Sequence, residues 1–428
     1  MDKTKILVIT VSSWNSRVGA NTWTSLLQNY DSSNVANICI RDEIPDSPVC
    51  SRYFVISENR ILKSILKRNV QTGREVEPCE SSVTDSKDID EHNERYRKMR
   101  KKRRYSMLLA REIVWKIGKW RTKELDEFLD SFKPDIILHS MEGYIHLNRI
   151  VEYSIIRTGA KAIGYIWDDN FTYKQSNKWG YKVYRFFQRK SLKKLAKRTS
   201  RFFAISPMTK IEADAFFGID CEILTKPLNR TPIVEKRTFG KPIRMLYTGN
   251  LLIGRDRSLL KVVKIMKERF SGDFVVDVYT QTILDEVKRR DLECGGVCRI
   301  HAPIPQSDVL KKQMEADILL FLEDIDGPNA NIARLSFSTK ITDYLSAGKA
   351  IFAVGNKRTA PMQYLIQEKA AIVASSDDEI VANLKHFLND SSMINEYAQG
   401  ACAVGVKNHS MDKIQQVFYD VLMSVLPK

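Results

Sequence analysis

The most regular feature of the sequence is a series of short apolar runs separated by stretches with helical periodicity. In the first half these runs occupy residues 6–11, 135–139, 161–167 and 201–205. Continuous apolar runs of this length are typical of parallel strands that are covered on both faces. The first run, ILVITV, is followed by a polar loop and then by a helical pattern over residues 22–30. This order of strand, loop and helix predicts an α/β domain.

The same alternation starts again after residue 242. Strands are expected at 243–247, 274–279, 297–301, 317–322 and 350–354. Helices are expected at 258–269, near 284–290, at 308–315 and from Lys340 onward. Two complete patterns of this kind predict two Rossmann-like, doubly wound domains that face each other across a cleft.

Three stretches without a clear period suggest the domain boundaries. Residues 231–242 contain two prolines and are expected to form a linker between a first domain, 1–230, and a second domain, 243–405. Residues 70–105 are polar and highly charged, so they are expected to form an exposed insertion in the first domain. Residues 406–428 are expected to form a terminal helix that packs back toward the first domain.

The net charge of +16 is concentrated in two segments. Residues 95–123 carry thirteen Lys and Arg residues against one acid, and residues 174–201 carry eleven against none. Both segments mix aromatic side chains with the cations, which favours the interface of an anionic bilayer as a partner. Nucleic acid is the competing partner, but no helix-turn-helix, zinc or RNA-binding sheet motif accompanies the charge, so it is disfavoured.

Several absences concern the location of the protein. The seven cysteines form no metal-ligand or disulfide pattern, so reduced thiols are expected. The start of the chain, MDKTKILVITV, lacks the features of a signal peptide, and no stretch approaches the ~18 apolar residues of a membrane span. Together with the basic segments, these features predict a cytoplasmic protein that is peripheral at the inner face of the membrane.

The helix expected in TKITDYLSAG begins with a cation, although the partial positive charge at a helix amino terminus repels lysine. Ser336, Ser338 and Thr339 are N-cap candidates just before it. Free N–H groups and Lys340 would suit a phosphate, and the carboxylate of Asp343 would suit the hydroxyls of a ribose. The alternative is that Lys340 and Asp343 form an exposed i, i+3 pair with no ligand.

A second candidate for phosphate binding follows the strand at 243–247. The loop reads YTGNLLIGRDRSL and contains Gly249, Asn250 and Arg255. A glycine lets a ligand approach the backbone, and an arginine can donate forked hydrogen bonds to a diphosphate. Ligands of open parallel sheets bind beyond the carboxyl ends of the strands, where this loop and the helix at Lys340 are both expected. The sequence therefore predicts a site for a nucleoside diphosphate.

With these motifs, the second half resembles the donor domain of GT-B glycosyltransferases, in particular the retaining enzymes of family 4. The resemblance covers residues 243–405 and extends more loosely to the first half through PDIILH, GYIWDD and FFAISPMT. It implies a GT-B fold and transfer of a sugar from a UDP- or GDP-sugar to an acceptor. It also implies retention of configuration, with no metal and no other cofactor.

The resemblance assigns residues to the donor site. Lys340 and Asp343 match the lysine and the ribose-binding acid of the motif Ser/Thr-Lys-x-x-acid-Tyr-Leu-x-x-Gly, and IHAPIPQSDV resembles the loop that packs on the base. Arg255 and Lys340 are expected to stabilise the departing diphosphate, which itself takes the acceptor proton. The expected donor-site residues are Gly249, Asn250, Arg255, Pro303, Ile304, Ser338, Thr339, Lys340 and Asp343.

Two positions depart from the family pattern. Leu335 replaces the first acid of the paired-acid motif, and Asn250 stands where a phosphate-binding arginine is usual, with Arg255 at the lysine position. These departures leave open a basic protein that binds membrane or nucleic acid without catalysis. A sugar-nucleotide epimerase of GT-B shape is a further alternative.

The first half is expected to bind the acceptor, a glycan or a lipid-diphosphate-linked sugar. Gly19 would allow close approach of the acceptor or of the donor phosphate, and His139 ends a strand where it could touch the transferred sugar. Asp168 and Asp169 follow the strand at 161–167. Either carboxylate could orient an acceptor hydroxyl, and Asp168 is the expected catalytic one.

One motif argues for a different mechanism. Glu323-Asp324-Ile325-Asp326 follows an apolar strand and resembles the Asp-x-Asp of metal-dependent GT-A transferases. That motif lies near the amino end of a single nucleotide-binding domain, whereas here it follows two α/β patterns. A metal-dependent reaction is therefore the less favoured alternative.

Overall fold

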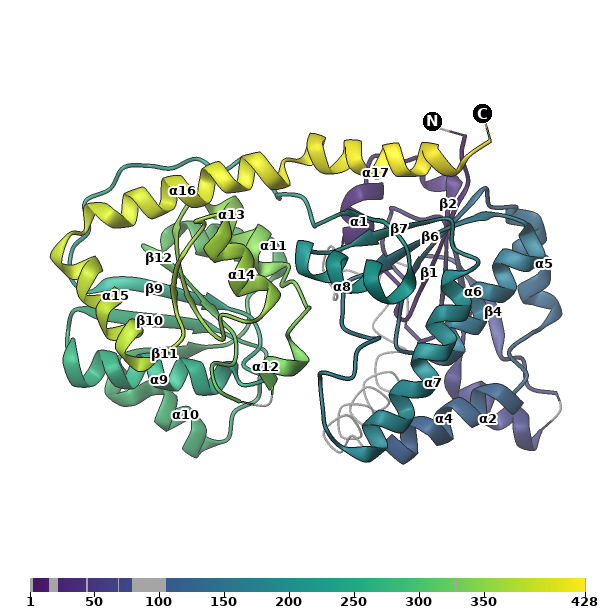
Figure 1. Cartoon of the computed structure of the whole chain (residues 1–428), viewed down its shortest axis with the longest axis horizontal. Helices are drawn as coiled ribbons and strands as arrows, with labels where there is room; N and C mark the ends of the chain where they lie inside the picture. The colour runs from purple at the N-terminus through teal and green to yellow at the C-terminus, as the bar shows by residue number, and fades with distance from the viewer. Residues whose placement is uncertain are drawn as a thin grey trace. The chain divides into compact units, whose positions relative to one another are not determined.

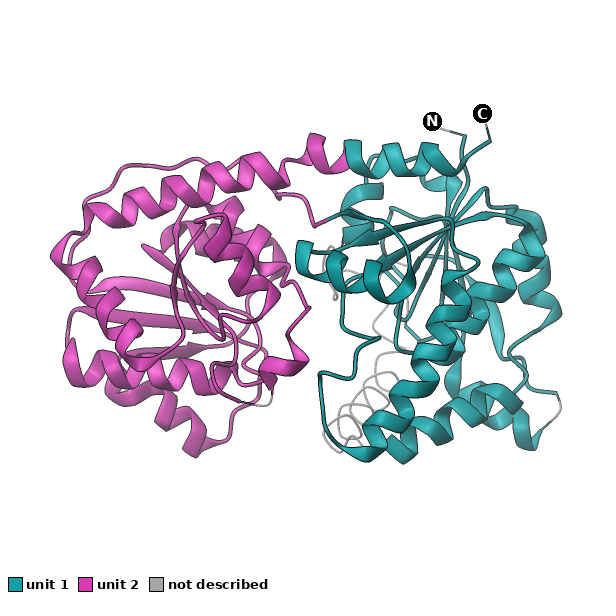
Figure 2. Ribbon diagram, viewed as in Figure 1, with its two compact units in different colours: residues 1–224, 416–428 teal, residues 225–415 magenta. Residues whose placement is uncertain are grey.

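The computed structural model describes residues 3–14, 22–43, 45–67, 69–78, 105–327 and 329–427. It confirms the predicted alternation of strands and helices in both halves (Figure 1). The chain divides into two compact units, which are residues 1–224 with 416–428 (unit 1) and residues 225–415 (unit 2) (Figure 2). The domain boundaries expected from the sequence remain predictions, because compactness does not test whether each part folds independently.

The sheet of unit 1 has the strand order β4-β3-β2-β1-β5-β6-β7-β8. Its described strand pairs are parallel except for β3 with β4. The strands are β1 (Ile6–Thr10), β2 (Val35–Cys39), β3 (Arg52–Ile56), β4 (Gly73–Val76), β5 (Ile136–Ser140), β6 (Lys161–Ile166), β7 (Arg201–Ala204) and β8 (Cys221–Ile223). The strand order reverses between β1 and β5, and ligands of such sheets bind beyond the carboxyl ends near this point.

The helices of unit 1 cover this sheet (Figure 1). They are α1 (Thr22–Leu27), α2 (Glu58–Leu66), α4 (Tyr105–Ile117), α5 (Lys123–Phe132), α6 (Ile145–Thr158), α7 (Trp179–Ala196) and α8 (Pro207–Phe217), with a 3₁₀ turn η1 (Ser32–Asn34). Helix α17 (Met411–Val425) begins in unit 2, but its residues from 416 onward belong to unit 1. There Phe418 is fully buried, with its ring 6.1 Å from those of Trp23 and Phe203.

Part of the stretch 70–105, which was expected to form an exposed insertion, has regular structure. Residues 73–76 form β4, which pairs antiparallel with β3, while residues 79–104 lie outside the described part of the chain. Strands β2 and β3 were not expected from the apolar runs. No helix in the described residues is long and apolar enough to span a bilayer.

The sheet of unit 2 is parallel, with the order β11-β10-β9-β12-β13-β14. The strands are β9 (Ile243–Thr248), β10 (Phe274–Tyr279), β11 (Cys298–His301), β12 (Ile318–Leu322), β13 (Ala350–Val354) and β14 (Ile372–Ala374). The helices are α9 (Arg255–Arg269), α10 (Glu286–Glu293), α11 (Gln306–Glu315), α12 (Asn329–Ile332), α13 (Lys340–Ala347), α14 (Ala360–Gln367), α15 (Asp377–Asn389) and α16 (Ser392–His409), with a 3₁₀ turn η3 (Cys294–Gly296). This is the doubly wound order of a Rossmann domain, and it reverses between β9 and β12.

Candidate functional site

The switch point of unit 2 brings Lys340 onto the loop that follows β9. Its Nζ donates to the hydroxyl of Tyr247 at 2.9 Å and lies 4.5 Å from the centre of that ring. Gly249 has a φ of 134°, and a Cβ at this position would lie 2.2 Å from Lys340 Nζ. A glycine is favoured here by its backbone conformation, and any side chain at this position would displace the ammonium group of Lys340.

Arg255 reaches the same loop from the start of α9. Its Nη1 donates to Asn250 Oδ1 at 3.0 Å, and its Nη2 donates to Glu323 Oε1 at 2.9 Å. Glu323 follows β12 and is almost fully buried, and its Oε2 has no hydrogen-bond partner among the residues that the structure describes. The buried carboxylate holds the guanidinium beside Asn250, which is a fixed position for a group that could bind a diphosphate.

The two cations influence each other. Burial, and then the charge of Arg255, lower the pKa of Lys340 to about 7. The side chain of Lys340 is therefore only partly charged at neutral pH, because part of the solvation of its ammonium group is lost. A bound anion would favour the charged form, so this site gains positive charge when a phosphate enters.

Asp343 lies one turn along α13 from Lys340 and is already paired with a different cation. Its Oδ1 accepts hydrogen bonds from Lys226 Nζ at 2.6 Å and from Asn229 Nδ2 at 2.9 Å. Lys226 is only 5% exposed, so Asp343 compensates a buried charge. This pairing could not be predicted from the sequence, because Lys226 and Asp343 are more than a hundred positions apart.

We expect Asp343→Ala to lower the free energy of unfolding by about 2 kcal/mol, since it leaves the buried ammonium of Lys226 without its partner. The double variant Lys226→Met/Asp343→Ala removes both charges and should recover most of that loss. Urea denaturation of the wild type, both single variants and the double variant measures the coupling. Strictly additive losses would contradict it.

The remaining predicted donor residues lie in two loops, one before α11 and one before α13. Pro303 and Ile304 belong to the loop between β11 and α11, and Pro303 is exposed. Thr339 occupies the N-cap position of α13, but its side chain makes no capping hydrogen bond. The expected capping by a hydroxyl is therefore not observed at Thr339, whose carbonyl accepts from Thr342 Oγ1 at 2.8 Å. Ser338 is half-buried, and its carbonyl accepts from the amide of Ile341.

In unit 1 the predicted acceptor residues lie in different environments. His139 is fully buried, its Nε2 is 3.1 Å from Thr199 Oγ1, and burial lowers its pKa to about 4. Asp169 is also fully buried and accepts from the amide of Thr172 at 2.9 Å. Asp168 is exposed at the end of β6. Gly19 lies outside the described residues.

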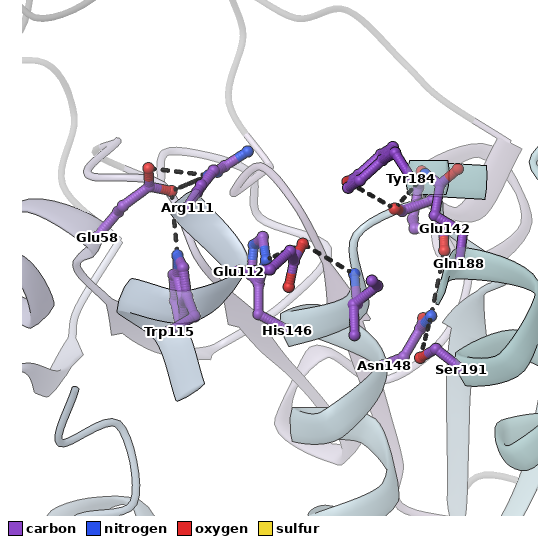
Figure 3. Close-up of polar contacts among 12 residues, drawn as sticks. Glu58, Arg111, Glu112, Trp115, Glu142, His146, Asn148, Tyr184, Gln188 and Ser191 are labelled. Carbon is purple, nitrogen blue, oxygen red and sulfur yellow. Dashed lines mark hydrogen bonds and ion pairs between the residues drawn. The ribbon is translucent and has the colours of Figure 1, made fainter. Parts of the chain in front are cut away.

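Glu142 was not expected from the sequence. It follows β5 by two residues and so lies at the same sheet edge as Asp168, which follows the neighbouring strand β6. Burial, and then the charge of Asp168, raise its pKa to about 7. Its carbonyl accepts from Asn148 Nδ2 at 3.3 Å, near α7 (Figure 3). An acid just beyond an apolar strand was the only available sequence signal.

The acids of the possible metal motif have other partners. Glu323 binds Arg255, and Asp324 accepts from Arg257 Nη2 at 2.7 Å. Asp326 is paired with Lys261 at 3.2 Å. Within the described ranges, no group of His, Cys, Asp and Glu residues has the arrangement of a metal site. These pairings support a role for the two buried acids in positioning arginines.

Comparison with known proteins identifies the fold. No family model and no curated protein matches the chain. HepE of Anabaena, solved in complex with UDP and glucose, matches with a TM-score of 0.62 at 9% identity, over 99% of this chain and 100% of that one. Sucrose-phosphate synthase of Thermosynechococcus elongatus matches with a TM-score of 0.60 at 9% identity, over 99% of each chain. A glycosyltransferase of Rickettsia africae matches with a TM-score of 0.58 at 10% identity, over 98% of each chain.

At such low identities the comparison establishes a shared fold. The predicted fold class, two Rossmann-like α/β domains of the GT-B type, is confirmed.

Proposed function

We propose that this chain is a glycosyltransferase that moves a hexose from a UDP- or GDP-sugar to a glycan or lipid-linked acceptor. The observation that carries the proposal is the contact of Lys340 with Tyr247, at the carboxyl end of β9, and of Arg255 with Asn250, in the loop that follows this strand. Structures of HepE, which shares the fold, were solved in complex with UDP and with UDP-glucose. A nucleotide-sugar donor in unit 2 is consistent with the position of these two cations and with the ligands of HepE.

In this proposal the donor diphosphate lies against the loop after β9. Gly249 allows the phosphates to approach the backbone, and Arg255 and Lys340 stabilise the negative charge that develops on the leaving diphosphate. Asn250 donates from its amide, because Arg255 occupies its carbonyl oxygen. The reaction proceeds with retention, as in family 4, and the leaving phosphate takes the acceptor proton without a metal ion.

The other donor groups bind the nucleoside. The Oδ2 of Asp343 accepts from a ribose hydroxyl while its Oδ1 remains paired with Lys226. The loop at Pro303 and Ile304 packs on the base, and Ser338 and Thr339 lie at the amino end of α13 beside the phosphates.

The acceptor binds in unit 1 in this proposal. Asp168 orients the acceptor hydroxyl, because it is the exposed acid at the carboxyl edge of the sheet. His139 and Asp169 are fully buried, so they position this edge rather than touch the acceptor. The basic segments 95–123 and 174–201 place the protein on the cytoplasmic face of an anionic membrane, where it is peripheral.

A screen of nucleoside diphosphates tests the donor half of the proposal. We expect UDP or GDP to raise the melting temperature in the absence of divalent metal, since a ligand that binds the folded state at 100 times its Kd stabilises it by about 2.7 kcal/mol. AMP and inorganic phosphate serve as controls, because each lacks part of the recognised group. No gain with any diphosphate would favour a protein without donor chemistry.

A further inference from the structure

Helices α2 and α4 of unit 1 lie side by side, and together they carry a surface that the basic segments alone did not reveal (Figure 1). The two helices are joined near their ends. A Cβ at Gly118, just after α4, would lie 2.4 Å from Ile61 Cγ2 of α2, and the amide of Lys119 donates to Ser64 Oγ at 3.1 Å. The helices therefore present one continuous face.

That face is apolar although it is exposed. Six large apolar side chains of the two helices are between 41% and 87% exposed. They are Leu62, Ile65 and Leu66 of α2 and Met107, Ile113 and Ile117 of α4. Single exposed hydrophobic residues are common, but a cluster on two packed helices indicates an interaction surface. We call these six residues the α2–α4 face.

Among the described residues on and beside helices α2 and α4, the charges that are left unpaired are positive. Lys63, Lys67, Lys116 and Lys119 are exposed, and within the described part of the chain none is paired with a carboxylate. The acids of the two helices are not available to a partner. Glu58 accepts two hydrogen bonds from Arg111 Nε, at 2.9 and 2.8 Å, and Glu112 is buried against His146 at 2.9 Å (Figure 3).

The second basic segment differs in this respect. Arg189 lies over the rings of Tyr173 and Phe216, and Lys193 also lies over Phe216. Lys194 is paired with Glu152 at 2.5 Å. Several cations of α7 therefore bind within unit 1, whereas the four lysines beside the α2–α4 face are free for an external anion.

We propose that the α2–α4 face docks on an anionic lipid bilayer, with its six aliphatic side chains entering the acyl boundary and its lysines contacting the head groups. Exposed aliphatic side chains with unpaired cations on and beside the same helices are complementary to such an interface, which combines an apolar interior with negatively charged head groups. The inference rests on the membrane-surface acceptor of the proposed function and specifies which part of the chain carries the contact.

The test is co-sedimentation with vesicles of phosphatidylcholine alone or mixed with phosphatidylglycerol. The full-length wild type should bind the mixed vesicles and release them at high salt. The variant Leu62→Ser/Leu66→Ser/Ile117→Ser should bind these vesicles more weakly by on the order of tenfold or more, because the apolar contribution is lost. The control variant Ile211→Ser/Ile283→Ser removes two side chains elsewhere that are at least 70% exposed, and it should bind as the wild type does.

A second measurement reports insertion itself. Lipids brominated in their acyl chains should quench the fluorescence of Leu66→Trp more than that of Ile283→Trp. Unchanged sedimentation of the triple variant, equal binding to neutral vesicles, or equal quenching of the two tryptophan variants would overturn the proposal. A wild-type dimer that the triple variant cannot form would also overturn it, since a second copy of the chain would then cover the face.

These results are independent of the donor site. The triple variant should keep the gain in melting temperature with UDP or GDP. Absence of that gain in the wild type, with vesicle binding that still depends on the α2–α4 face, would reject the glycosyltransferase and leave the docking surface in place.

Discussion

Replacing Arg255 with glutamine is expected to weaken the binding of UDP or GDP on the order of 100-fold and to remove most of the associated gain in melting temperature. The guanidinium is held at the loop after β9 by Asn250 and Glu323, and charge-assisted bonds to a diphosphate contribute about 1.5–3 kcal/mol each. Isothermal titration calorimetry measures the affinity directly.

This variant needs a control for stability, because it also leaves the buried carboxylate of Glu323 without its partner. The double variant Arg255→Gln/Glu323→Gln removes the unpaired charge and should still bind weakly. Arg257 is on the same helix as Arg255 and forms a similar ion pair with Asp324. The variant Arg257→Gln breaks that pair and should keep the full ligand response. Normal affinity in the double variant would exclude Arg255 from the donor site.

The second large effect concerns pH and Lys340. Burial and the neighbouring Arg255 lower the pKa of this lysine to about 7, so it is mostly neutral above that pH when no ligand is bound. A diphosphate favours the protonated form, and binding must then take up one proton. The affinity should fall about tenfold per pH unit above neutrality until the pH reaches the raised pKa of the complex.

Measurements between pH 8 and 9.5 isolate this effect, because the terminal phosphate of the nucleotide is already ionised there. Calorimetry in two buffers with different ionisation enthalpies counts the proton. Lys340→Met should bind weakly with a flat pH profile. Arg255, whose charge acts on Lys340, stays protonated in this range, because burial, which lowers the pKa of its guanidinium, is outweighed by the charge of Glu323, which raises it above the usual value. An unchanged affinity across it would contradict the assignment.

The strands that could be predicted from the sequence are those buried on both faces. β10 and β13 begin and end where the apolar runs do. β2 was not predicted because Asn37 interrupts its apolar run. Asn37 is nevertheless fully buried, and its Nδ2 donates to the carbonyl of Val8 at 2.9 Å. β4 was not predicted because it is a short, polar edge strand. Its pairing with β3 depends on a partner that is distant in the sequence.

The site divides in a similar way. Gly249, Arg255 and Lys340 could be placed at one sheet edge because the alternation of strands and helices determines which loops meet there. Their ion pairs could not be predicted, since Glu323 and Lys226 lie far along the chain from Arg255 and Asp343. His139 was misleading because a histidine at a strand end reads the same whether it is buried or accessible.

The burial of Phe418 between Trp23 and Phe203 has a consequence during synthesis. The nascent amino-terminal part of unit 1 lacks part of its hydrophobic core until the ribosome has translated nearly two hundred further residues. Those residues form unit 2, which can therefore fold before unit 1 is complete. A chaperone that shields this incomplete core, or a stop codon shortly before residue 418, would therefore affect the beginning of the polypeptide more than its middle.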